Sequence, residues 1–82
     1  MTTSPHGATA DKEIADRITN AIIIKNLNVK AISDETGISY PTLRRSLKGG
    51  RSFTIAELER IASAINVPTS ALLPEYLTRS AA

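Results

Sequence analysis

The stretch that decides the fold runs from residue 28 to residue 49, NVKAISDETGISYPTLRRSLKG. It reads as two short helices joined by a tight turn at Gly37, since glycine readily adopts the left-handed conformation that ends a helix. Asn28 and Ser39 suit the N-cap positions of the two helices. Pro41 falls in the first turn of the second helix, where its missing N–H does no harm. The stretch therefore predicts a helix-turn-helix.

The second helix of this stretch has distinct inner and outer faces. Leu43 and Leu47 lie four residues apart and should anchor it to a core, which leaves the polar side chains on its other faces. Residues 40–51 hold no acid and four basic residues, Arg44, Arg45, Lys48 and Arg51, although the whole chain carries a formal net charge of only +2. A local excess of positive charge on one helix is typical of a surface that binds nucleic acid.

The composition limits the classes of protein to which the chain can belong. A chain of 82 residues forms one domain, and with only 4% aromatic residues its core must be built from Ile, Leu and Ala. The absence of cysteine excludes disulfides and thiolate metal sites. The sequence has neither a membrane-spanning run nor an export signal, which favours a soluble, cytoplasmic protein. His6 stands alone, and no nucleophile–base pairing, carboxylate pair or glycine-rich phosphate loop is present, so we expect no metal, no cofactor and no enzyme activity.

Upstream of the motif, residues 1–8 are expected to form a disordered tail, and the first helix is expected to begin near Thr9 to Asp11. The apolar residues of this helix repeat at three- and four-residue spacing and mark one buried stripe, Ile14, Ile18, Ala21 and Ile22. Ile23 and Ile24 widen the stripe beyond one face. Either the helix is central and contacted on several sides, or these two residues form a surface for a partner or a second copy.

Downstream of the motif, Thr54 and Glu57 form a capping box that begins a fourth helix, and Phe53 and Leu58 stand where a hydrophobic staple would pack. The apolar stripe of that helix is expected to contain Ile55, Leu58, Ile61, Ala62 and Ile65.

The last ordered segment is PTSALLP, residues 68–74, which predicts a short helix with Leu72 and Leu73 inward. The folded domain is thus expected to span residues 9–74. Residues 75–82 form an arm with Tyr76 and Leu77 as its large apolar residues, which packs loosely, pairs with another subunit or frays.

These features in this order resemble the family of small phage repressor and Cro-like DNA-binding domains, also called the xenobiotic-response-element type. The resemblance rests on the turn Gly37-Ile38-Ser39, the Leu43 anchor and the phrase FTIAELERIASAINVPTSALL at residues 53–73, and it covers residues 10–74. It implies an all-α fold, a compact lambda-repressor-like bundle of about five short helices.

The resemblance also implies how the chain contacts DNA, with the third helix in the major groove and the preceding helix across the backbone. Carried over by position, the residues that read bases are Tyr40, Pro41, Thr42, Arg44 and Arg45. The residues assigned to phosphates are Asn28, Lys30, Ser39, Lys48 and Arg51. The alternatives are a solvated basic face for the arginines, packing on Pro41 for Tyr40, and ordinary surface for Lys30. Many family members carry glutamine where this chain has Val29 and Tyr40, so its target sequence must differ from theirs.

The function implied is sequence-specific binding of double-stranded operator DNA by a transcriptional regulator, expected to be a repressor of the phage type. Family members usually bind palindromes as dimers, so a homodimer is expected, formed in solution or only on DNA. The alternative is a protein-interaction module on the same fold, an antitoxin or an adaptor. It would depend on Ile23 and Ile24 of the first helix or on the C-terminal arm more than on Arg45.

Overall fold

The computed structural model describes residues 6–74, with side chains from residue 10 onward. Its elements are α1 (His6–Ile24), α2 (Val29–Thr36), α3 (Tyr40–Leu47), α4 (Ile55–Ile65) and a 3-10 helix, η1 (Thr69–Leu72). Between residues 6 and 74 there is no strand. The prediction of an all-α bundle is therefore confirmed, with the last short helix in the 3-10 form.

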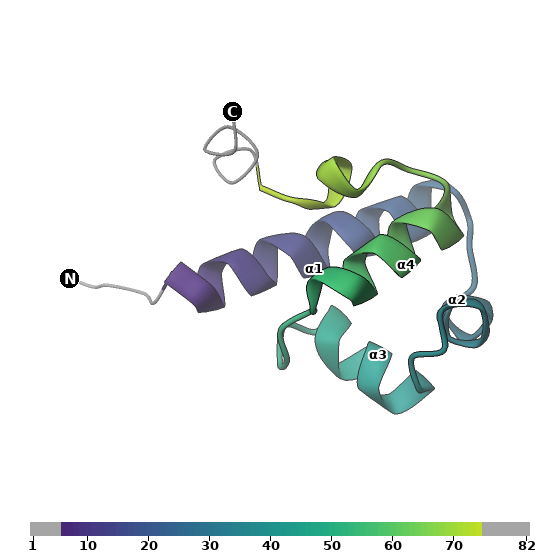
Figure 1. Cartoon of the computed structure of the whole chain (residues 1–82), viewed down its shortest axis with the longest axis horizontal. Coiled ribbons are helices and arrows are strands. Elements are labelled where there is room, and N and C mark those ends of the chain that lie inside the picture. Colours follow the sequence, from purple (N-terminus) through teal and green to yellow (C-terminus); the bar gives the residue numbers. More distant parts are fainter. Residues whose placement is uncertain (1–5, 75–82) are drawn as a thin grey trace.

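The long helix α1 forms the back of the bundle, and α3 and α2 lie below α4 (Figure 1). Helix α2 packs against α3 and α4, α3 packs against α1, and η1 packs against α1 and α4. Each of the three shorter α-helices therefore buries one face against at least one neighbour, which short helices need because they are marginal in isolation.

The core is aliphatic, as its composition predicts. The buried core residues are Ile14, Ile18, Ile22, Ile32, Ile38, Leu43, Leu58, Ile61, Ala62, Ile65 and Leu72. Phe53 and Leu73 pack against this cluster and are half-buried. With so few aromatic rings, the core fixes the helices through many small contacts between branched side chains.

The junction between α2 and α3 is closed by hydrogen bonds. Asn28 caps α2 by accepting from the Ala31 N–H at 3.1 Å, and Gly37 ends that helix at φ 78°. The buried Ser33 hydroxyl donates to the Ile38 carbonyl oxygen at 2.6 Å. The turn is thus fixed by its own backbone and by the helix before it, and it sets where α3 begins.

Helix α1 begins earlier than the sequence indicates, at His6 rather than near Thr9 to Asp11. Once a helix exists, each residue added to its end gains one backbone hydrogen bond, and Ala8 and Ala10 favour such an extension. Asp11 therefore does not cap the helix. Its carboxylate accepts from the Ser52 hydroxyl at 2.6 Å instead.

Three isoleucines in or beside the predicted apolar stripes are exposed. Ile55 is 69% exposed, because it is the first residue of α4 and Phe53 packs against the core in its place. Ile23 and Ile24 are 68% and 81% exposed at the end of α1, so the explanation that α1 is covered on several sides is wrong for these two positions.

The ends of α1 and α4 are joined by Lys25. Its ammonium group donates to the carbonyl oxygens of Ile65 at 2.9 Å and Asn66 at 3.3 Å. Carbonyls at a helix C-terminus lack partners within the helix, and a cation there also suits the helix dipole. Lys25 therefore stabilises the end of α4.

The predicted domain limits, with a tail over 1–8 and an arm over 75–82, stay predictions, although α1 already includes residues 6–8 of that tail. Tyr76 and Leu77 lie outside the described residues.

Substitution of Gly37 tests the importance of the turn. Gly37→Ala should lower the free energy of unfolding by about 1–2 kcal/mol, because alanine adopts a positive φ only with strain. An added Cβ would meet no atom within 4 Å, so strain alone accounts for the effect. Urea unfolding measures the difference, with Gly37→Asn as the control, since asparagine tolerates this conformation. Equal losses in the two variants would contradict this explanation.

Candidate nucleic-acid interface

Helix α3 has one buried face and one exposed face. Leu43 and Ser46 are 1% and 0% exposed, and Leu47 packs half-buried against the core. The exposed face carries most of the predicted reading residues, Tyr40, Pro41, Arg44 and Arg45, followed by Lys48, and Thr42 is half-exposed beside them. The structure thus brings the five predicted base-reading residues together on one short helix.

Tyr40 and Arg44 form a pair across one turn of α3. A guanidinium N–H of Arg44 donates to the Tyr40 hydroxyl at 3.1 Å, and the Arg44 Cζ lies 5.7 Å from the centre of the tyrosine ring. Both the hydrogen bond and the cation–π attraction orient the arginine. Packing of Tyr40 on Pro41 stays a prediction, and the four-residue spacing was the signal that could have found the pair with Arg44.

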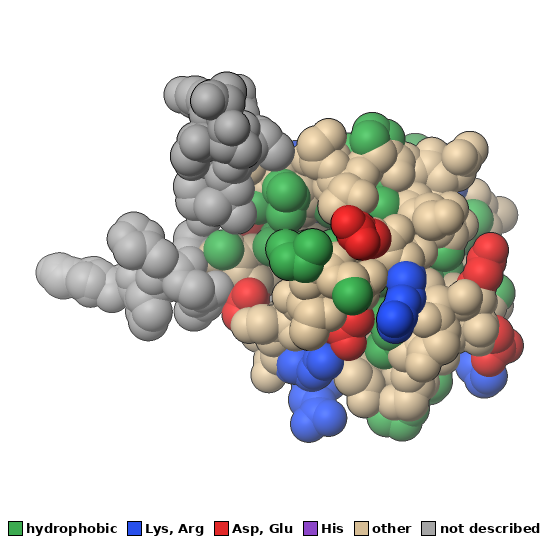
Figure 2. Space-filling view, viewed as in Figure 1, with side chains coloured by type: hydrophobic (Ala, Val, Ile, Leu, Met, Phe, Trp, Pro, Cys, Tyr) green, Lys and Arg blue, Asp and Glu red, His purple; other side chains and the backbone are tan. Residues whose placement is uncertain are grey.

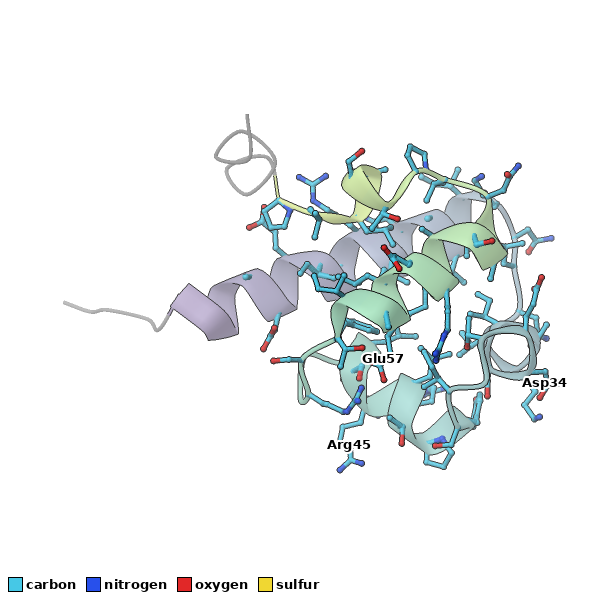
Figure 3. The ribbon with its side chains drawn as sticks, viewed as in Figure 1. Asp34, Arg45 and Glu57 are labelled. Atoms are coloured by element: carbon cyan, nitrogen blue, oxygen red, sulfur yellow. The ribbon has the colours of Figure 1, made fainter. Side chains whose placement is uncertain are left out.

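Arg45 extends from α3 away from the rest of the bundle (Figure 3). Its backbone carbonyl accepts from the Gly50 N–H at 3.0 Å. A Cβ on Gly50 would lie 3.3 Å from the Arg45 Cγ, so the glycine leaves room for the aliphatic part of the arginine. The base of Arg45 is therefore held by the loop after α3, while its exposed guanidinium reaches into solvent.

The charges of this face are not neutralised locally. Among residues 10–74, ion pairs join Lys12 to Asp16, Arg17 to Glu13, Lys30 to Asp34 and Arg51 to Glu57. Arg44, Arg45 and Lys48 take part in none of them. Basic side chains project at the lower edge of the molecule, which α3 forms (Figure 2). The exposed face of α3 therefore keeps an excess of positive charge, as an anion-binding surface requires.

The residues assigned to phosphates on the flanks of α3 already have protein partners. Asn28 uses its side-chain oxygen to cap α2, and Lys30 pairs with Asp34 at 2.9 Å on the solvent side of α2 (Figure 3). Ser39 caps α3 at 3.4 Å and hydrogen-bonds the Thr42 hydroxyl at 2.8 Å. Asn28, Lys30 and Ser39 are all exposed, so these contacts leave them accessible from solvent.

Arg51 lies in different surroundings from the other predicted phosphate residues. Its guanidinium makes two hydrogen bonds to the Glu57 carboxylate, at 3.1 and 2.9 Å, and a third to the Ser46 hydroxyl at 3.0 Å. Glu57 lies where the start of α4 approaches α3 (Figure 3). Glu57 follows Arg51 by six residues in the sequence. A spacing across a loop does not reveal whether two side chains are in contact, so the pair could not be predicted.

The Arg51–Glu57 pair changes the acidity of both groups. The hydrogen bonds from Arg51 lower the pKa of the Glu57 carboxyl below its ordinary value of 4.5, against the opposing effect of burial. The same hydrogen bonds raise the pKa of Arg51. The pair is therefore fully charged at neutral pH.

The described part of the chain was compared with two further patterns, a cluster of metal ligands and a membrane-spanning helix. Within it no three His, Cys, Asp or Glu side chains are grouped as a metal site would need. No helix among residues 6–74 has the length and apolar character to cross a membrane.

Comparison with known proteins agrees with this geometry. The BetR domain family matches residues 7–82. Among solved structures, an HTH_3 family transcriptional regulator from Vibrio cholerae is 30% identical with a TM-score of 0.75, over 80% of this chain and 37% of that one. This chain thus spans well under half of that regulator's length. No curated protein sequence matches the chain.

A second solved structure, the restriction-modification controller protein C.AhdI from Aeromonas hydrophila, is 14% identical with a TM-score of 0.72, over 77% of this chain and 96% of that one. At this identity the likeness concerns the fold alone. Together with the family match, it confirms the predicted Cro-like helix-turn-helix domain.

The Arg51–Glu57 pair should make stability depend on pH. Because the pKa of Glu57 is lower in the folded state than its ordinary 4.5, the stabilisation is complete above that value and is lost as the pH falls through the folded pKa. Urea unfolding of the wild type and of Glu57→Gln, from neutral pH down to about pH 3, should give a difference that shrinks in acid. A constant difference over the range would contradict this role of the carboxylate.

Proposed function

We propose that this chain, which belongs to the BetR domain family, is a sequence-specific double-stranded DNA-binding transcriptional regulator that acts as a repressor. The observation that carries the proposal is the exposed face of α3, where Arg44, Arg45 and Lys48 have no acidic partner among the described residues. The helix-turn-helix fold and the regulator from Vibrio cholerae support it. The role is binding alone, without catalysis or a cofactor.

In the proposed complex α3 enters the major groove with its N-terminal residues nearest the base edges. Arginine can donate two hydrogen bonds to guanine O6 and N7, which is the commonest specific contact in that groove. Arg45, whose guanidinium extends freely, is the first candidate for such a contact. Arg44, oriented by Tyr40, would contact a second base, while Pro41 and Thr42 would contact a thymine methyl group.

Contacts to phosphates would set the position of the duplex without reading its sequence. Lys48, at the end of α3, is exposed and unpaired within residues 10–74. Asn28, Lys30 and Ser39 lie at the starts of α2 and α3, where free backbone N–H groups also attract phosphate oxygens. Exchange of the exposed Lys30–Asp34 pair for a phosphate contact costs little, since such surface pairs are weak.

Repression would follow from occupation of an operator, as in phage-type repressors. A homodimer on a palindrome would place two copies of α3 about one helical turn apart. Sedimentation at micromolar concentration, free and with DNA, distinguishes a dimer in solution from one that forms only on the operator.

A protein-interaction module on the same fold, such as an antitoxin or adaptor, is the second candidate. The exposed Ile23 and Ile24 favour it, because adjacent large apolar side chains on a surface often mark a binding site. It predicts that replacement of both isoleucines by serine abolishes the biological effect while Arg45→Ala preserves it. The DNA-binding proposal predicts that Arg45→Ala abolishes the effect.

Substitutions of Arg45 and Lys48 provide a matched test, which distinguishes recognition of base pairs from contact with phosphates. A duplex selected by the wild type from a random library serves as the specific probe, and a random duplex as the non-specific one. Arg45→Ala should weaken specific binding by about 5- to 150-fold, equivalent to 1–3 kcal/mol, and should relax the preference at one base pair. Unchanged affinity for the specific duplex would show that Arg45 does not recognise a base pair.

Lys48→Ala should instead weaken binding to both duplexes alike. The plot of log K against log salt concentration should become less steep by about 0.9, the contribution of one phosphate contact. A change in the preferred sequence would contradict this role.

Tyr40→Phe tests whether the tyrosine hydroxyl orients Arg44. The ring and its cation–π contact remain, but the hydrogen bond at 3.1 Å is lost. Specific affinity should fall by about two- to tenfold, as expected for one hydrogen bond, with the salt dependence unchanged. Repeated in an Arg44→Ala background, the substitution should have no effect, and an equal loss there would show that Tyr40 contacts DNA by itself.

A further inference from the structure

We propose that Arg51 is a positioning residue that clamps α3 to the start of α4, and that it does not bind phosphate. This inference rests on the proposed function, since it concerns how accurately α3 is presented to DNA. It replaces the phosphate role that the family resemblance implies for Arg51.

The clamp consists of a two-point contact between Arg51 and Glu57. Two different guanidinium nitrogens donate to the two carboxylate oxygens, at 3.1 and 2.9 Å. The side chains are 32% and 14% exposed, so the pair is more shielded than the ion pairs on α1 and α2. A paired arginine–carboxylate contact restricts both side chains and fixes their relative orientation.

The clamp holds α3 at Ser46. The Ser46 hydroxyl accepts from Arg51 at 3.0 Å, and this residue is 0% exposed on the inner face of α3. Ser46 follows Arg45 directly, so a shift of its backbone moves the base of Arg45. The arginine thus links α3 with α4 at the turn that carries the main candidate for reading a base.

The other side of the clamp is equally fixed. The Glu57 carboxylate also accepts from the Thr54 N–H at 2.9 Å, and the Glu57 N–H donates to the Thr54 hydroxyl at 3.1 Å, which completes the capping box of α4. Ser52, the residue after Arg51, bonds Asp11 of α1 at 2.6 Å. The loop after α3 is therefore attached to α1, α3 and α4.

Binding of phosphate by Arg51 would conflict with these contacts. Both terminal nitrogens already donate to Glu57, and the carboxylate cancels the charge that would attract a phosphate. Lys48, three residues earlier, has neither constraint. The two basic residues at this end of α3 therefore have different roles. Lys48 binds phosphate, and Arg51 holds α3 in position.

The salt dependence of DNA binding separates the two roles, because its slope counts phosphate contacts. The random duplex and the selected duplex are titrated with the wild type, Arg51→Ala, Arg51→Lys, Glu57→Gln and, as the matched control, Lys48→Ala. We expect Arg51→Ala to leave the slope on the random duplex unchanged and to reduce the ratio of specific to non-specific affinity by about tenfold, within the range of one misplaced base contact.

The conservative variants sharpen the test. Arg51→Lys keeps the charge but cannot make the two-point contact, so it should lose specificity as Arg51→Ala does. Glu57→Gln should also lose specificity although Arg51 is intact and its charge is released. A slope reduced by about 0.9 in Arg51→Ala, restored by Arg51→Lys, would overturn the proposal and establish a phosphate contact.

Amide hydrogen exchange provides a readout that needs no DNA. In Glu57→Gln the amides of the last turn of α3 should exchange faster, while those of α2 should not. If the wild type binds neither duplex, the proposed function fails, and this exchange pattern alone decides whether the clamp exists. Unchanged exchange in α3 would overturn the clamp whatever the DNA titrations show.

Discussion

The left-handed conformation of Gly37 is the constraint on which the rest of the structure depends. At φ 78° it ends α2 and turns the chain so that α3 begins three residues later. The buried hydrogen bond from Ser33 to the Ile38 carbonyl holds the turn closed at 2.6 Å. Because Leu43 then reaches the aliphatic core, the opposite side of α3 must face solvent. The exposure of the basic face is thus a consequence of a backbone angle.

The basic residues of this chain divide by whether they have partners. Lys25 caps the end of α4, and Arg51 joins α3 to α4, so the positive charge of each is used within the fold. Arg44 and Arg45 have no acidic partner within residues 10–74. A net charge counted along the sequence treats all four alike, although only Arg44 and Arg45 carry their charge on the exposed face of α3.

The helix-turn-helix was predictable from sequence because its signals are local. A cap such as Asn28 and a turn glycine act within a few residues of themselves. The contact of Arg51 with Glu57 was not predictable, since it depends on how a loop closes between two helices. The exposure of Ile55 was missed for a related reason, because periodicity shows which face of α4 is apolar but not how far along the helix its neighbours extend.

The separation of the two faces of α3 has a consequence for how such a protein evolves. Leu43 and Ser46 hold the helix, while the exposed side chains from Tyr40 to Lys48 contribute little to the core. In the proposed complex with DNA, substitutions on the outer face would therefore alter the recognised sequence with little effect on stability. If the domain binds DNA in this way, a duplicated copy would acquire a new target in a few mutational steps without passing through unfolded intermediates.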